Sequence, residues 1–529
     1  MRQLSDQDAV FLYSDTAHSN SNVTLLHIYD QSTAPGGKVR FKSILAHVEN
    51  RLDRLPVFRQ LIRKVPFGLD RPYWVEDVNF NLEYHVRHIA LPKPGDWRQF
   101  CIQASRIHAR PLDVHRPLWE MYVIEGLDSF LDLPQGSFAV LLKIHHAAID
   151  LEHGYQITTL LHDLSPESAP YEAPEPWFPE APPGDATLLL RAAAHSVLYP
   201  FRRLRRTARA LSAVVPTLFE RVMEAVRRPE SVVVTRFNTA VSPHRVFDTR
   251  RFPLEQFKLV RGLVKDATVN DVVFAVCGGG LRRYLEQQGE LPDGSLTASA
   301  PLSVRAAGGK GSGRHQFSWM RVRLGTDIAD PVARLAMIRG QTASSAQMAN
   351  AVSARELTDI ARYAPGATIA MTSKLLAYAS AQLGPWASLA NCTVANVPGP
   401  TVPLYLQGAR LTYFSAIMPI SDGMGLVFSV TSYDGKIILS FTCCYEQLPD
   451  PAAFAQCMRD SFQEYLGLAS AQRRSANARA RHRPVRRAGT QSKSAGLSAG
   501  VSGARRKSLP RASSRRPRAR RKSPPLASA

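Results

Sequence analysis

The sequence predicts an α/β protein with two domains and a disordered basic tail. The chain has 529 residues, which is more than one hydrophobic core usually serves. Residues 1–165 alternate strand-like apolar runs with helical periodicity, and this alternation resumes near Arg245. We therefore expect an N-terminal domain over 1–165, a linker over 166–239, a C-terminal domain over 240–468 and a tail over 469–529.

The expected elements of the first half follow from local patterns. Residues 23–29 read as a strand, and residues 41–55 repeat apolar side chains at helical spacing. The apolar run at 138–142 predicts a buried strand. Residues 166–183 contain seven prolines and little periodicity, which marks a linker.

The second half predicts one long helix and several strands. We expect the helix at 271–285, and a hairpin whose turn is Asp434-Gly435, a dipeptide that favours tight turns. The expected strands are 317–324, 425–433 and 437–444.

The net charge of +22 resides mostly in the tail. Residues 469–529 hold 18 of the 66 Lys and Arg residues and no Asp or Glu, so the remaining 468 residues carry 48 basic and 44 acidic side chains. A composition of Arg, Ser, Ala and Pro cannot bury a core, which predicts disorder. Because the body is nearly neutral, we expect no nucleic-acid partner; binding of nucleic acid through the tail is the alternative.

A second basic segment lies at 186–228, where nine Arg stand against two Glu. Over 201–227 the apolar residues fall on one helical face and the arginines crowd the other. This pattern is typical of a helix at a membrane surface. A helix packed on its own domain with a solvated charged face is the alternative. We expect residues 201–227 and the basic tail to bind a membrane surface or a lipid droplet.

The compartment is expected to be the cytoplasm. Six cysteines occur without a CxxC pair, which favours reduced thiols. The N-terminus lacks the apolar core of a signal peptide, and no uninterrupted apolar run approaches 18 residues. We therefore expect a protein that is peripheral to the inner membrane or to lipid droplets.

The most informative motif follows the expected buried strand. His145, His146 and Asp150 form an HHxxxD pattern, in which one imidazole can act as a general base while the carboxylate fixes the local geometry. Together with His153 they could be metal ligands by type. Adjacent strand residues point to opposite sides, so we expect no metal.

Further motifs accompany this one. They are Arg116-Pro-Leu-Trp-Glu120, Thr268-Val-Asn-Asp-Val-Val273, Pro301-Leu-Ser-Val-Arg305 and Asn396-Val-Pro-Gly-Pro400. In this order they closely resemble the bacterial wax ester synthase/acyl-CoA:diacylglycerol acyltransferase family, from Leu4 to about Leu468. The resemblance implies two chloramphenicol-acetyltransferase-like (CoA-dependent acyltransferase) domains around a central tunnel.

The same resemblance implies roles for the motif residues. His146 would be the general base, and His145 would support the site from the other side of the strand. Asp150 would hold its loop through an ion pair, for which Arg305 is a candidate partner. Trp119 would be structural support.

Three further residues would bind substrate at the acyl-transfer cleft: Asn270, Asp271 and Asn396. Asn270 and Asp271 open a predicted helix, so N-capping by the Asn is the alternative for this pair. For Asn396 to Pro400 the alternative is a plain rigid turn.

The implied reaction moves an acyl group from long-chain acyl-CoA to diacylglycerol or a long-chain alcohol. Acyl-CoA is then a substrate, and no bound cofactor is implied. Leu151 stands where the family's HHxxxDG pattern has Gly. This departure leaves a second hypothesis open, a catalytically weak or inactive paralogue that binds lipid or lipid droplets.

Overall fold

The structure is a computed structural model, and the chain falls into two units, Met1–Ala476 and Asn477–Ala529. The sheets all lie in the first unit. The residues that the structure describes are 1–129, 133–149, 154–167, 176–198, 233–304, 316–349, 390–397, 399–400 and 402–481.

The first large sheet has six strands in the order β12-β13-β2-β7-β6-β5. Its neighbours are antiparallel except β5 and β6, which are parallel. The strands are β2 (Asn22–Asp30), β5 (Val86–Ala90), β6 (Trp119–Glu125), β7 (Phe138–His145), β12 (Tyr405–Leu406) and β13 (Ala409–Ile417).

Strand β7 is buried along its whole length, as its apolar run predicts. Val140 and Leu142 face one hydrophobic cluster, together with Ile44 of helix α2 (Phe41–Glu49). Leu141, on the opposite face, joins a cluster that includes Phe100 of helix α4 (Trp97–Ala109). Because both faces are covered, the strand reads as a continuous apolar run rather than an alternating one.

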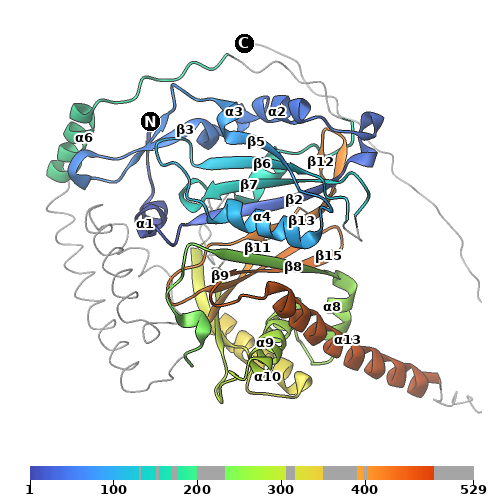
Figure 1. Ribbon diagram of the computed structural model, residues 1–529. Coiled ribbons are helices and arrows are strands. Elements are labelled where there is room, and N and C mark those ends of the chain that lie inside the picture. The colour runs from blue at the N-terminus through green and yellow to red at the C-terminus, as the bar shows by residue number, and fades with distance from the viewer. Residues whose placement is uncertain are drawn as a thin grey trace, which may run out of the picture. The chain divides into compact units, whose positions relative to one another are not determined.

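The second large sheet has the order β10-β9-β11-β14-β15-β8. Figure 1 shows helices α9, α10 and α13 on the side of this sheet away from the first sheet. The strands are β8 (Arg245–Pro253), β9 (Thr297–Val304), β10 (Gln316–Arg323), β11 (Cys392–Val397), β14 (Leu426–Tyr433) and β15 (Lys436–Cys444). The helices are α8 (Leu254–Arg261), α9 (Val269–Gln287), α10 (Pro331–Ala349) and α13 (Pro451–Arg481).

Smaller elements complete the described chain. A three-stranded sheet has the order β1-β4-β3, and four further α-helices belong to the described residues of the first half of the chain. These elements are β1 (Arg2–Gln3), β3 (Gln60–Arg63), β4 (Tyr73–Glu76), α1 (Asp6–Ser14), α3 (Leu82–His85), α5 (Gly154–Leu160) and α6 (Asp185–Leu198).

The two halves of the sequence share a sheet. After β11 in the second sheet, the chain crosses over and contributes β12 and β13 to the first, where β13 pairs antiparallel with β2. Gly399 lies in this crossover, and a Cβ there would stand 2.0 Å from the carbonyl oxygen of Ser432. The crossover therefore needs glycine at this position, because any side chain would clash with the backbone of β14.

Side chains also join the halves. The indole Nε1 of Trp97 donates to Asp248 Oδ1 at 2.8 Å, and the hydroxyls of Thr249 and Tyr413 are 2.6 Å apart. Phe247 and Ile438 belong to the same hydrophobic cluster as α4. A sequence boundary near 240 is therefore crossed by a sheet, by hydrogen bonds and by a common core.

The expected elements of the second half are found within two residues of their predicted ends. The helix expected at 271–285 is α9, and the strands expected at 317–324, 425–433 and 437–444 are β10, β14 and β15. The predicted hairpin turn is confirmed, since Asp434 and Gly435 both have positive φ, 47° and 71°. This is the backbone that a two-residue hairpin turn requires.

Two expected ends are corrected. The helix expected over 41–55 ends at Glu49, and a short 3-10 turn with its own cap follows before Pro56. Leu55, the residue before the proline, has non-helical backbone, as proline favours. Helix α13 runs on to Arg481, past Leu468, and Ala469 is buried against the core.

The linker and the basic segment are partly described. Within the expected linker, helix α6 packs Leu188 and Ala192 against Tyr73 and Val75. The arginine-rich residues 201–227 lie outside the described residues. Among the described helices, none is long and apolar enough to cross a membrane. The six cysteines are buried and free.

Several histidines are buried in the first half of the chain as neutral imidazoles. Burial lowers the pKa of His108 to about 3, and the pKa values of His47 and His162 to about 4. His47 Nε2 donates to the Leu161 carbonyl at 2.9 Å, and His108 Nδ1 lies 2.9 Å from Thr24 Oγ1. These contacts satisfy neutral rings without supplying a counter-charge.

Stability should therefore fall on mild acidification. A histidine whose folded pKa lies below 6.5 contributes stability that is complete above about pH 6.5 and is lost as pH falls towards its folded pKa. Each such histidine should cost about 1 kcal/mol per pH unit between pH 6 and pH 5. We expect urea unfolding to give a lower free energy at pH 5 than at pH 7.5, with a shallower pH dependence in His108→Gln. A free energy that stays constant or rises would contradict the neutral assignment.

Candidate active site

The HHxxxD motif begins where strand β7 ends. His145 is the last residue of β7, and His146 opens the 3-10 turn η6 (His146–Ala148). The His145 amide donates to the Leu118 carbonyl at 3.0 Å, and the His146 amide donates to the Ser21 carbonyl at 2.8 Å. The backbone of the pair is thus fixed by two separate segments.

The imidazole of His145 is fully engaged in the protein. Its Nε2 lies 2.9 Å from Asp15 Oδ2, and its Nδ1 accepts a hydrogen bond from the Ala147 amide at 3.1 Å. Only 3% of its surface is exposed. With both ring nitrogens used, His145 has no nitrogen free for a substrate.

The imidazole of His146 has a different environment. It stacks on Phe11 of helix α1, with ring centroids 3.9 Å apart and 17° between the planes. Its Nδ1 is buried and makes no well-formed hydrogen bond to any described residue. Burial lowers the pKa of His146 to about 4, with a further lowering from His145 and an opposing contact with its own carbonyl. The ring is therefore neutral at pH 7 and able to accept a proton.

The rest of the motif lies beyond what the structure describes. Asp150 and Leu151 fall between the turn η6 and helix α5, and Arg305 follows β9 directly. The ion pair expected between Asp150 and Arg305 stays a prediction. Among the described residues, no group of three His, Cys, Asp or Glu side chains could hold a metal ion.

Trp119 lies in the core. It is 1% exposed, and its Nε1 donates to the Phe58 carbonyl at 2.9 Å. Its ring stacks between Phe58 and His85, at centroid distances of 4.4 and 4.7 Å. Since Trp119 opens β6, the neighbour of β7, these contacts hold the sheet in place beside the histidines.

The Asp271 carboxylate is held by hydrogen bonds at the start of α9. The helix begins at Val269, and its N-cap is Thr268 rather than Asn270. Asp271 Oδ2 accepts from the Thr268 amide at 2.7 Å while Thr268 Oγ1 accepts from the Asp271 amide at 3.1 Å, which is a capping box. Thr342 Oγ1 donates to Asp271 Oδ1 at 2.7 Å. Asn270 is exposed, and the expected substrate-binding role of both residues stays a prediction.

Asn396 lies in a strand, whereas the sequence predicted a turn from this residue. It is exposed and pairs with Val430 as part of β11. The break from the strand comes after Val397, because the crossover to the first sheet starts there. The role of Asn396 in substrate binding also stays a prediction.

Sequence reasoning missed Phe11 and Asp15, which contact the two histidines from helix α1 and its C-terminal cap. They lie about 130 positions upstream of the motif, and no spacing rule links them to it. Only the pairing of β2 with β7 brings the segment after α1 beside the end of β7.

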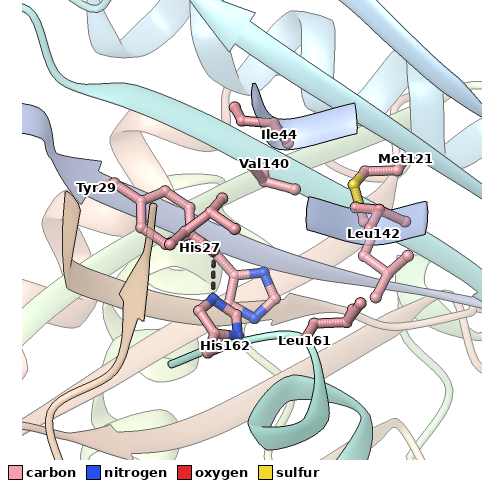
Figure 2. Close-up of a pocket in the computed structure, with 10 residues that line it drawn as sticks. His27, Tyr29, Ile44, Met121, Val140, Leu142, Leu161 and His162 are labelled. Carbon is pink, nitrogen blue, oxygen red and sulfur yellow. Dashed lines mark hydrogen bonds between the residues drawn. The ribbon is translucent and has the colours of Figure 1, made fainter. Parts of the chain in front are cut away.

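A narrow cavity lies on the α2 side of the first sheet. Figure 2 shows His27, Tyr29 and His162 in it, among aliphatic side chains such as Val140 and Leu161. The Tyr29 hydroxyl is 2.5 Å from His162 Nε2. Since His162 Nδ1 is bonded to the Thr158 carbonyl and therefore donates, Tyr29 is the donor to Nε2.

The sequence matches two family descriptions. One is "Wax ester synthase/diacylglycerol acyltransferase catalytic domain", over residues 4–273, and the other is "WS/DGAT C-terminal domain", over residues 315–465. The first of these covers both histidines and helix α1.

Individual relatives agree with the family match. Two proteins of Mycobacterium tuberculosis, both named for an inferred diacylglycerol O-acyltransferase activity, are each 32% identical to this chain. The one from strain CDC 1551 / Oshkosh aligns over 88% of this chain and 90% of its own length. The one from strain H37Rv aligns over 88% of this chain and 98% of its own length.

A solved structure confirms the expected fold. The wax ester synthase/diacylglycerol acyltransferase of Marinobacter aquaeolei VT8 superposes with a TM-score of 0.64 at 23% identity. The match covers 89% of this chain and 100% of the other. By sequence and by fold, the chain belongs to the wax ester synthase/diacylglycerol acyltransferase family of enzymes.

Proposed function

We propose that this protein transfers an acyl group from long-chain acyl-CoA to diacylglycerol or a long-chain alcohol, with His146 as the general base. One observation supports this above the others. His146 is a neutral, partly buried imidazole at the end of a rigid strand, in a chain of an acyltransferase family.

The chemistry follows from the two substrates. An alcohol oxygen is a poor nucleophile while it carries its proton, so a base within hydrogen-bond reach is needed as it attacks the thioester carbonyl. His146 would take that proton and return it to the sulfur of the departing CoA. Both substrates meet in one site, and no acyl-enzyme intermediate is required.

The other motif residues would act around this base. His145 and Trp119 support the strand end through the contacts described above. Asp150 would order the loop after the motif by pairing with Arg305, while Asn270, Asp271 and Asn396 would bind substrate along the cleft. Acyl-CoA enters as a substrate, and no cofactor is needed.

Product analysis tests the function directly. Purified protein is incubated with palmitoyl-CoA and either dioleoylglycerol or hexadecanol, and the lipids are separated by mass. We expect triacylglycerol or wax ester, with one free CoA released per ester formed. If neither acceptor is acylated while the folded protein still retains lipid, the second hypothesis holds, in which Leu151 marks an inactive lipid-binding paralogue.

Replacing the base should abolish most turnover. We expect His146→Ala to lower kcat by about two to four orders of magnitude, the usual contribution of a positioned base. His88 offers a control, because it also stacks on a phenylalanine, Phe41, but lies outside the motif. His88→Ala should leave kcat within about twofold. Near-normal turnover in a folded His146→Ala protein would refute the assignment.

We also propose that the protein is cytoplasmic and attaches peripherally to the inner membrane or to lipid droplets, through residues 201–227 and the basic tail. The support is compositional, since the arginines of this segment crowd one side of its apolar stripe. Each basic side chain near an anionic surface contributes about 1 kcal/mol.

Neutralising the arginines should therefore weaken attachment. Changing Arg202, Arg203, Arg205, Arg206 and Arg209 together to Gln should reduce co-sedimentation with liposomes that contain phosphatidylglycerol. The comparison is made in a protein truncated after Arg481, so that the tail does not mask the effect. Unchanged co-sedimentation would contradict the proposal for this segment.

A further inference from the structure

Helix α1 contacts both histidines of the motif. Phe11, in its second turn, stacks on His146, and Asp15, its C-cap residue, hydrogen-bonds His145. The segment after α1 adds a third contact, because the Ser21 carbonyl accepts from the His146 amide at 2.8 Å. Helix α1 and the residues after it therefore meet the motif at three points.

These contacts form a closed circuit of hydrogen bonds. Asp15 Oδ1 accepts from the Ser21 amide at 2.7 Å, and Asp15 Oδ2 lies 2.9 Å from His145 Nε2. His145 Nδ1 accepts from the Ala147 amide at 3.1 Å. Ala147 follows His146 in the chain, and the His146 amide donates to the Ser21 carbonyl, which closes the circuit. The backbone on both sides of His146 is thus tied to one carboxylate.

The circuit also fixes the tautomer of His145. A backbone amide only donates, so Nδ1 must be the acceptor of the Ala147 bond and the ring proton must be on Nε2. Nε2 then donates to the Asp15 carboxylate, which only accepts. A carboxylate that holds a histidine in one tautomer and orientation is a recurring device of second-layer positioning.

Phe11 acts on the other histidine. At a centroid distance of 3.9 Å it covers one face of the His146 ring, which keeps water from that face. Burial is the largest cause of the lowered pKa of His146. Phe11 is itself held, since its carbonyl accepts from Ser14 Oγ at 3.0 Å and from Ser21 Oγ at 3.2 Å.

We propose that Asp15 and Phe11 are positioning residues for the general base: Asp15 orients the turn that carries His146 through His145, and Phe11 fixes and desolvates the His146 ring. This inference rests on the proposed function, because it assigns the two residues to the base that His146 would be. Neither residue needs to touch substrate.

Two substitutions of His145 separate the links of the circuit. In His145→Asn the amide oxygen takes the place of Nδ1 and keeps the hydrogen bond from the Ala147 amide, but the hydrogen bond to Asp15 is lost. In His145→Gln the amide nitrogen takes the place of Nε2 and keeps the Asp15 bond. If the carboxylate positions the turn through His145, each substitution breaks one link of the path, so both should lower kcat. Asp15→Asn should resemble His145→Asn, in which the Ala147 bond is kept and the contact with Asp15 is lost. We expect kcat to fall about 10- to 100-fold with the KM for acyl-CoA unchanged.

The chain provides a matched control set. His88 stacks on Phe41 at 4.8 Å and pairs with Glu125 at 3.2 Å, which repeats the aromatic and carboxylate contacts away from the motif. Glu125→Gln and Phe41→Leu should leave kcat within about twofold. If Asp15→Asn behaves like Glu125→Gln, the role proposed for Asp15 is wrong.

Removing Phe11 gives a readout that general destabilisation does not. In Phe11→Leu and Phe11→Ala the His146 ring gains water, so its pKa should rise from about 4 towards 6.5. The acid limb of the kcat/KM profile should move up by at least one pH unit, while Phe11→Tyr, which keeps the stack, should restore the original limb. NMR titration of the ring reports the same pKa in the folded protein without turnover, and Phe11→Leu serves if Phe11→Ala does not fold.

The outcomes separate this inference from the proposed function. If His146→Ala remains active, the general-base assignment fails for reasons unrelated to α1. If His146→Ala is inactive while the Phe11 variants keep the original acid limb and pKa, the role of Phe11 in positioning is refuted and the base assignment stands. The positioning role of Phe11 would also be refuted if kcat fell only in proportion to the loss of folded protein and the acid limb of the kcat/KM profile did not move.

Discussion

The pairing of β13 with β2 is the constraint on which the rest of the structure depends. Strand β2 is buried, so its backbone groups need partners on both edges. Strand β7 supplies one edge and β13, from the second half of the chain, supplies the other. Strand β7, which ends at His145, therefore lies two strands away from β13. Neither half completes this sheet alone, which explains why the hydrophobic cluster around Phe247 and α4 spans both halves.

Two basic side chains near the end of β7, Lys143 and His146, have different surroundings. Lys143 is fully buried two residues before His145, and its Nζ lies 3.0 Å from Glu120 Oε2 and donates to the carbonyls of Ile107 and Arg110. Burial lowers the pKa of Lys143, and the Glu120 carboxylate opposes this lowering. His146 has no such surroundings among the described residues, and burial leaves it neutral. The same low-polarity environment that excludes charge thus provides a ring able to accept a proton.

Much of the secondary structure could be predicted from the sequence because it is specified locally. The apolar run of β7 and the Asp434-Gly435 turn depend on neighbouring residues, and both were found as expected. The strand in which Asn396 lies was mistaken for a turn, since pairing with β14 overrides the prolines that follow. Asp271 was expected at a helix start and does lie there, but its partner Thr342 is distant in sequence and follows from the packing of α10 on α9.

By itself, the sequence determined the family, the α/β class and the identity of the histidine pair, because residue types at short spacing carry that information. Only the tertiary structure decided which partners hold each histidine. Both ring nitrogens of His145 are used, one by Asp15 and one by Ala147, whereas His146 stacks on Phe11. The physical reason is that hydrogen bonds and stacking need proximity in space. That proximity comes from the pairing of β2 with β7, which joins segments more than a hundred residues apart.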